Sequence, residues 1–299
     1  LGLTPNPDVM CNKKIKFGLF LKKALKAGAD YIATGHYTRI RQEIINSKIQ
    51  NLKFKLLAGI DKNKDQSYFL WTLSQEQLKR CLFPIGEYTK PEVRELARKF
   101  GLPNAERKDS QGLCFVGKVD FREFLSNYIP EKPGLVVDID GKVLGAHRGI
   151  QFYTIGQRHG IGLGGTGKPY FVVQKDANNN ILYVAKGENH PALYTNEIIA
   201  KDMHWVSGKM PTFPLRVQAR IRYRQSLQPA ELIEIKNEKP MLKVKFDEPQ
   251  RAVAPGQSIV FYSKEELLGG GIIAQACNLS EIWKKANIAA KVIARSQSI

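Results

Sequence analysis

The pattern of apolar residues changes near residue 117, and this change limits most strongly the folds open to the chain. Before it, segments with helical spacing surround one short apolar strand at 31–34. After a further helical segment at 119–130, short segments with alternating apolar residues continue almost to the end. A helix followed by a strand predicts an open α/β sheet, and runs of short strands predict small β domains. We therefore expect an α/β part followed by mostly-β parts.

The first helical segment carries two residues of chemical interest, Asp8 and Cys11. After them, apolar residues at helical spacing alternate with lysines up to Gly28, which is typical of an amphipathic helix with a C-terminal glycine. Cys11 would lie at or just before the helix N-terminus, where the helix dipole and nearby lysines lower the pKa of a thiol. Asp8 either caps the helix or exchanges protons, and the two interpretations carry equal weight.

The short strand at 31–34 ends at Gly35 and His36. Ligands of open α/β sheets bind beyond the carboxyl ends of the strands, so Gly35 would let a ligand approach the backbone and His36 would lie at its rim. A histidine that makes its hydrogen bonds within its own loop and has no role in ligand binding is the more frequent outcome at such a position. Two capping boxes further on predict structural helices, Ser74 with Gln77 and Thr89 with Glu92.

The net charge is the strongest signal in the composition. The chain has 46 Lys and Arg against 28 Asp and Glu, a formal charge of +18, which attracts polyanions. Nucleic acid is the expected partner, and an acidic membrane surface is the alternative. Because the sequence has no apolar run of about 18 residues and no secretory pattern, we expect a cytoplasmic protein that does not enter a membrane.

Four cysteines occur, and no two of them are close in sequence: Cys11, Cys81, Cys114 and Cys277. This spacing excludes CxxC zinc modules and argues against a disulfide framework of the secreted kind, so no bound metal is expected. Cys81 follows Leu78 at helical spacing and is expected to pack as a small apolar residue. Cys114 lies in the glycine-flanked stretch DSQGLCFVG, which is typical of a loop.

Short strands dominate the second half of the sequence. Asp140 and Gly141 form a hairpin signal, and we expect a small β-barrel over 195–276. The segment 162–168 has the spacing of a phosphate-binding loop, but Pro169 removes both the hydroxyl group and an amide that such a loop needs. We therefore expect a connection between strands there.

The stretch LRVQARIRYRQS predicts a ladder of arginines. In a strand of period two, alternate residues project to one face about 6.6 Å apart, a spacing that suits successive RNA phosphates. The predicted outward residues are Arg216, Gln218, Arg220, Arg222 and Arg224. The same parity directs Tyr223 inward, and an ordinary solvated strand face is the alternative.

Eight ordered motifs between residue 1 and about 276 together resemble the bacterial tRNA-specific 2-thiouridylase family: TPNPDVMCNKKIKF, ADYIATGHYTRI, DKNKDQSYFLWTLS, KDSQGLCFVG, GQRHGIG, RYRQ, PGQSIVFY and LGGGII. The resemblance implies a Rossmann-type domain of the adenine-nucleotide α-hydrolase kind, a small central β domain and a C-terminal tRNA-binding barrel. The implied ranges are 1–118, 119–194 and 195–276, with a possible helical tail at 277–299.

The resemblance also implies a reaction and its residues. ATP, with Mg²⁺, would adenylate the C2 oxygen of the wobble uridine, and a cysteine persulfide filled by a sulfur-donor protein would supply sulfur. Cys114 would carry the persulfide, Cys11 would be the second cysteine, and Asp8 the acid or base. Gly35 would lie at the nucleotide, and these residues would touch tRNA: Asn6, Pro7, Asp8, His36, Lys64, Asp65, Gln66, Arg222, Tyr223 and Gln257.

Two departures from the family pattern lead to an alternative. Relatives begin with a Ser-Gly-Gly-x-Asp-Ser loop for the ATP phosphates, which does not precede Leu1, and Gln111 replaces a small hydroxyl residue. We therefore expect an N-terminally truncated sequence. A non-catalytic RNA-binding paralogue is the alternative function, and a generic ATP-dependent ligase is a third that leaves the arginine ladder unexplained.

Overall fold

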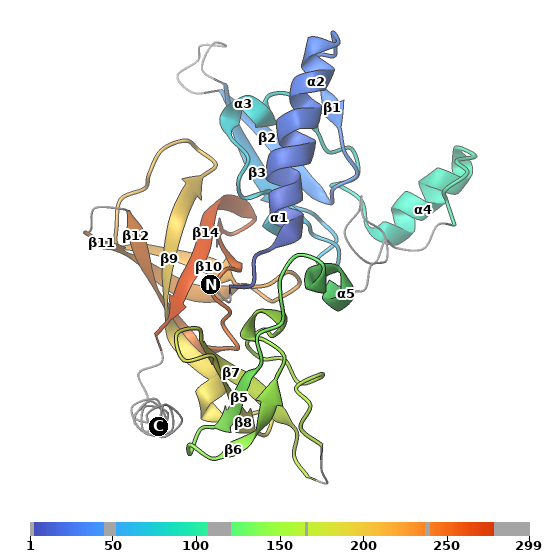
Figure 1. Ribbon diagram of the computed structural model, residues 1–299. Coiled ribbons are helices and arrows are strands. Elements are labelled where there is room, and N and C mark those ends of the chain that lie inside the picture. The colour runs from blue at the N-terminus through green and yellow to red at the C-terminus, as the bar shows by residue number, and fades with distance from the viewer. Residues whose placement is uncertain (1–2, 45–51, 107–120, 165–166, 237–239, 278–299) are drawn as a thin grey trace.

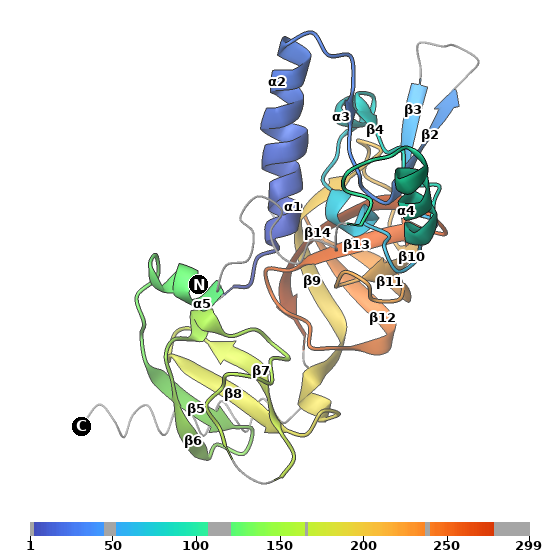
Figure 2. The same ribbon diagram turned by 90° about the vertical axis from the view of Figure 1, so that its right-hand side faces the viewer.

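The computed structural model describes residues 3–44, 52–106, 121–164, 167–236 and 240–277. Its first part opens with one long helix in three segments, which stands beside the barrel in Figures 1 and 2: α1 (Pro7–Cys11), η1 (Asn12–Phe20) and α2 (Leu21–Lys26). The middle segment η1 is a π-helix, and the helix ends at Ala27 before Gly28, whose φ is +91°. The predicted C-terminal glycine is confirmed.

A two-stranded parallel sheet follows this helix. β1 (Ile32–Ala33) pairs with β4 (Cys81–Leu82), and Cys81 is buried in this sheet. Between and after the strands lie short helical segments: η3 (Ser67–Leu70), α3 (Gln75–Leu78) and α4 (Lys90–Lys99). Both predicted capping boxes are present, at the starts of α3 and α4. These local signals were therefore sufficient to place the helix starts.

The central part is a four-stranded sheet of order β6-β5-β8-β7. Its elements are α5 (Phe121–Ser126), β5 (Gly134–Asp138), β6 (Val143–His147), η4 (Ile150–Phe152), β7 (Tyr170–Asp176), β8 (Ile181–Lys186) and η5 (Pro191–Leu193). The β5–β6 hairpin turns at Asp140 and Gly141, where the glycine has φ +90°. This confirms the predicted hairpin. The sheet lies apart from the first part in both ribbon views (Figures 1 and 2).

The last part is a closed six-stranded antiparallel barrel. Its strands are β9 (Tyr194–Trp205), β10 (Leu215–Arg220), β11 (Gln228–Ile235), β12 (Met241–Arg251), β13 (Ser258–Ser263) and β14 (Glu266–Ala276). The order is β13-β10-β11-β12-β9-β14, and pairing of β13 with β14 closes the ring. Closure removes the free strand edges that would otherwise pair with other chains. The predicted barrel is confirmed.

A hairpin from the first part joins the barrel sheet. β2 (Thr38–Ile44) and β3 (Leu52–Ala58) pair antiparallel, and β3 pairs with β14 through Leu56 opposite Leu267 and Leu57 opposite Glu266. The sequence analysis did not anticipate this hairpin. Its effect is to attach the α/β part to the barrel through backbone hydrogen bonds.

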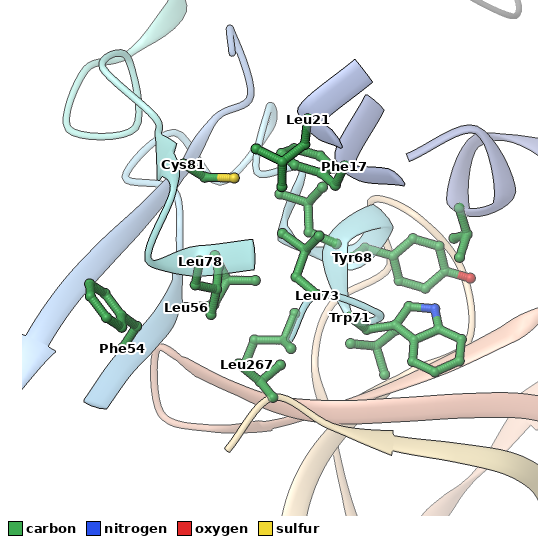
Figure 3. Close-up of a cluster of buried hydrophobic side chains, with 14 of the residues drawn as sticks. Phe17, Leu21, Phe54, Leu56, Tyr68, Trp71, Leu73, Leu78, Cys81 and Leu267 are labelled. Atoms are coloured by element: carbon green, nitrogen blue, oxygen red, sulfur yellow. The ribbon is translucent and has the colours of Figure 1, made fainter. Parts of the chain in front are cut away.

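The first part and the barrel also share one hydrophobic core. Figure 3 shows Phe17 and Leu21 of the long helix close to Leu73 and Leu78, with Leu267 of β14 below them. These five side chains are at most 5% exposed. The two parts are therefore packed together by apolar burial as well as by sheet pairing.

The predicted arginine ladder is wrong beyond Gln218. Val217 and Ala219 face the interior of the barrel and Arg216 is exposed, as parity requires, but Arg220 is only 5% exposed. The reason is that the segment 65–70 covers the outer face of β10 at this point. The strand then ends at Arg220, so Arg222 and Arg224 follow it in a turn and do not continue the ladder.

Instead of facing solvent, Arg220 forms a buried ion pair with Asp65. Its guanidinium donates to the Asp65 carboxylate and, at 2.6 Å, to the hydroxyl of Tyr262. Asp65 also accepts the backbone N–H groups of Gly59 and Ser67, at 3.0 and 3.1 Å. The Asp65 carboxylate thus accepts two backbone hydrogen bonds at Oδ1 and the guanidinium at Oδ2.

We expect Arg220→Met to lower the free energy of unfolding by about 3–5 kcal/mol, because it leaves the Asp65 carboxylate buried without its partner. Arg216→Met is the matched control in the same strand, since its bidentate pair with Asp247 is exposed and should contribute little. Urea unfolding of both variants measures the difference. Equal losses would show that the buried pair does not hold the two parts together.

Candidate active site and nucleic-acid interface

A cavity of about 940 Å³ opens between the long helix, the β1–β2 connection, the segment 64–69 and α4. It is lined by seven of the residues proposed from sequence: Asp8, Gly35, His36, Lys64, Gln66, Tyr223 and Arg224. They come from four stretches of the sequence that only the fold brings together. This cavity is the candidate functional site.

Asp8 lies in the first turn of the long helix. The helix starts at Pro7 and is capped by Asn6, whose side-chain oxygen accepts the N–H of Val9 at 3.2 Å. Asp8 is therefore not the cap, and the capping interpretation is wrong. The segment before the helix is anchored to the barrel, because Gln257 donates to the carbonyl of Thr4 at 2.8 Å and accepts from Asn6 at 3.4 Å.

The same helix start corrects the prediction for Cys11. This residue is the last of α1 and lies more than one turn inside the helix, where the effect of the dipole has faded. It is half-buried and does not line the cavity. Cys114, the proposed persulfide carrier, falls outside the described residues.

Burial raises the pKa of Asp8, and the positive charge of Lys16 partly offsets that rise. A carboxyl group with a raised pKa can change its protonation state closer to neutral pH than an exposed aspartate does. Lys16 and Asn12 share the cavity wall with Asp8, at intervals of four residues along the helix. The sequence analysis singled out neither, although this spacing from Asp8 was visible.

His36 lines the same cavity as Asp8 and is buried. Its Nδ1 lies 2.8 Å from the hydroxyl of Thr34. Its ring packs against those of Phe17 and Phe83, at 5.7 and 6.1 Å between centroids. Burial, followed by the charge of Lys16, lowers the pKa of His36 to about 3. The imidazole is therefore neutral at physiological pH and can exchange hydrogen bonds without bringing a charge.

Gln66 is fixed to the loop that carries His36. The side-chain oxygen of Gln66 accepts the backbone N–H of Tyr37 at 3.1 Å, and the backbone N–H of Gln66 donates to the Tyr37 carbonyl at 2.9 Å. Lys64 and Gln66 line the cavity, whereas the side chain of Asp65 between them turns inward to Arg220. The predicted Lys64–Gln66 contact region is therefore split between the cavity wall and the interior.

Aromatic rings form the side of the cavity next to the barrel. Tyr223 packs against Phe69 with 4.5 Å between ring centroids, and the guanidinium of Arg224 lies 5.2 Å from the Tyr223 ring. Tyr223 is half-buried at the cavity wall, so the inward direction predicted for it does not remove it from the site. Arg222 does not line the cavity, and its guanidinium donates to the carbonyl of Ala252.

The far side of the cavity is largely apolar. α4 presents Val93, Leu96 and Ala97 there, together with the basic side chains Lys90 and Arg94. A β-carbon at Gly35 would meet only the Ile85 side chain, at 3.9 Å, so there is open space beside this backbone. Apolar walls next to several cations fit the base and the phosphates of a nucleotide such as ATP.

The described residues contain no group of three or more His, Cys, Asp or Glu that could hold a metal ion. None of the helices among them is long and apolar enough to cross a membrane.

The low pKa of His36 predicts a pH-dependent stability. Between pH 6.5 and 3 the unfolded chain binds a proton at this residue and the folded chain does not, so stability falls as the pH is lowered. We expect wild-type protein to lose about 2 kcal/mol more than His36→Asn between pH 7 and pH 5. Urea unfolding at both pH values measures this, with the exposed His159→Asn as control. An identical pH dependence of all three proteins would contradict the prediction.

Three family models match the chain in order. Their descriptions are a tRNA methyl transferase HUP domain over residues 1–118, a tRNA methyl transferase PRC-barrel domain over 122–186 and an aminomethyltransferase beta-barrel domain over 195–273. These descriptions confirm the predicted fold class, a Rossmann-like α/β domain followed by two β domains.

Relatives with assigned functions match over most of the chain. A protein named tRNA-specific 2-thiouridylase MnmA from Geobacillus thermodenitrificans is 48% identical over 283 residues, which are 94% of this chain and 74% of the relative. Proteins of the same name from Protochlamydia amoebophila and Proteus mirabilis are 51% and 50% identical, over 92% and 91% of this chain and 70% and 73% of their own lengths. The chain belongs to the tRNA-specific 2-thiouridylase family.

Proposed function

We propose that this protein is a tRNA-uridine 2-sulfurtransferase that uses the cavity as its active site. The observation that carries the proposal is the assembly of Asp8, His36, Lys64, Gln66 and Tyr223 around one cavity in a member of this family. A cavity with a titratable carboxyl group, a neutral imidazole, cations and stacking aromatics suits an extruded RNA base.

The proposed reaction replaces oxygen by sulfur at C2 of the wobble uridine. ATP supplies the activation: the C2 oxygen attacks the α-phosphorus, the bond to the β-phosphate breaks and pyrophosphate leaves. The adenylyl group now on the C2 oxygen makes AMP a good leaving group. The terminal sulfur of a persulfide on Cys114 then attacks C2, and the C–O bond to AMP breaks. The thiolate of Cys11 attacks the Cys114 sulfur, which releases 2-thiouridine and leaves a Cys11–Cys114 disulfide for a cellular thiol to reduce.

Asp8 is assigned the proton transfers. As the C2 oxygen becomes a nucleophile, the uracil ring must give up its N3 proton, and a carboxylate beside the base can accept it. The ring regains a proton at N3 when the sulfur is released. Burial supports this role because it raises the pKa of Asp8. The pKa of the carboxyl group thereby comes closer to that of the uracil N3–H that it would deprotonate.

The remaining assignments concern partners. The formal charge of +18 favours binding of a polyanion, and we assign tRNA as that polyanion and the barrel as its binding part. The persulfide requires a sulfur-donor protein. We place the reaction in the cytoplasm, where thiols are kept reduced, with residues 1–118 catalytic and 195–276 binding tRNA. Magnesium would enter with the ATP phosphates, which usually supply part of its coordination.

We expect Cys114→Ser and Cys11→Ser to abolish 2-thiouridine formation while tRNA affinity stays within about twofold of wild type, because neither thiol provides charge for RNA binding. Single-turnover transfer from persulfide-loaded protein, with ATP, magnesium and unmodified tRNA, measures 2-thiouridine formation. Filter binding measures tRNA affinity. Cys277→Ser is the control, since this residue lies at the end of the barrel.

Two results would redirect the proposal. Wild-type protein that binds tRNA but forms no 2-thiouridine would favour the non-catalytic RNA-binding function. Equal loss of tRNA binding in the two cysteine variants would mean that the thiols support structure and do not carry sulfur.

A further inference from the structure

Lys16 is set apart from the other lysines of the long helix. It is half-buried and lines the cavity, whereas the other five are exposed and do not line it: Lys13, Lys14, Lys22, Lys23 and Lys26. The helix therefore presents one cation to the interior of the site and the rest to solvent.

The π-helical segment η1 explains this orientation. In an α-helix, residues four apart overshoot a full turn, because a turn takes 3.6 residues. In the wider π-helix, with hydrogen bonds from i to i+5, four residues fall short of a turn. The four residues from Asp8 to Asn12 lie mainly in α1, and the four from Asn12 to Lys16 lie in η1. The rotation beyond a full turn in the first interval is therefore offset by the rotation short of a full turn in the second. All three residues consequently line the cavity.

Within the described part of the chain, no close ion pair neutralises the charge of Lys16. Among the ion pairs of the described residues, none joins Lys16 to a carboxylate within 4.0 Å. Its electrostatic neighbours are Asp8, whose pKa it lowers, and His36, which is neutral. Asn12, beside it on the same wall, has a buried side-chain oxygen without a hydrogen-bond partner among the described residues. The cavity wall thus carries an ammonium group that a bound anion would complement.

We infer that Lys16 binds a phosphate oxygen of the nucleotide held in the cavity. The inference rests on the proposed function and extends it, because none of the residues assigned from the family motifs provides a cation next to Asp8. An ammonium group is a compact charge with three donors, suited to a phosphate oxygen. The oxygen can belong to the RNA backbone at the target uridine or to the adenylyl group on its C2 oxygen.

The test compares Lys16→Met, which keeps the length of the side chain, with Lys16→Arg, which keeps the charge. Lys14→Met is the matched control, because it removes the same charge from an exposed position of the same helix segment. The ligand is an anticodon stem-loop RNA, used unmodified and with one neutral methylphosphonate next to the target uridine. Affinity is measured without ATP, and single-turnover sulfur transfer is measured at saturating RNA with ATP.

A backbone contact predicts that Lys16→Met and the methylphosphonate each weaken binding about tenfold and that the two together weaken it no further. A contact with the adenylyl phosphate predicts unchanged binding and a transfer rate at least about tenfold lower in Lys16→Met. In either case Lys16→Arg restores most of the loss and Lys14→Met causes less than about twofold change.

The inference is overturned if Lys16→Met behaves like Lys14→Met in every assay that the wild-type protein supports. A wild-type protein that binds the stem-loop but transfers no sulfur would count against the proposed function. In that case the adenylyl contact falls together with the proposed reaction, and the binding experiment decides between the backbone contact and none. A tenfold loss that the methylphosphonate abolishes supports the backbone contact, and unchanged binding overturns the inference.

Discussion

The buried pair of Asp65 and Arg220 is the interaction on which the arrangement of the site depends. Removing both charges from water is costly, and it is compensated here by the backbone donors of Gly59 and Ser67 and by the hydroxyl of Tyr262. Because Asp65 is held against β10, its neighbours Lys64 and Gln66 must turn toward the cavity. A pair between the α/β part and the barrel thus fixes which side chains a ligand meets.

The barrel also supports the start of the long helix that carries Asp8. The N–H of Thr4 donates to the carbonyl of Pro255 at 3.1 Å, and Gln257 holds the segment just before Asp8. A β-carbon at Gly256 would lie 2.9 Å from the backbone nitrogen of Thr4, so a larger residue there would displace this contact. The position of Asp8, the proposed acid or base, is therefore set by the part proposed to bind RNA, 195–276, which would link binding to catalytic geometry.

The sequence predicted the features that depend on neighbouring residues. The capping boxes, the turn at Asp140 and Gly141 and the alternation along β10 up to Gln218 all follow from local backbone and burial rules, and the structure confirms them. It did not predict the β2–β3 hairpin on the barrel edge or the burial of Arg220. Both depend on which surface covers a strand from outside. The contact between Asp65 and Arg220 joins residues 155 positions apart, and the hairpin reaches β14 by pairing Leu57 with Glu266. The candidate site was found through motifs, but Asn12 and Lys16 required the winding of the helix.

Charge in this protein acts on two length scales. The net charge of +18 extends over the whole surface and can speed the encounter with a polyanion, but salt screens it within about 10 Å. Inside the cavity, the aromatic rings of Phe17 and Phe83 exclude water around His36, and burial raises the pKa of Asp8. A strongly cationic interior would lower the pKa of that carboxyl and weaken it as a base. The long helix avoids this conflict because only one of its six lysines, Lys16, lines the cavity, and the pKa of Asp8 stays raised beside it.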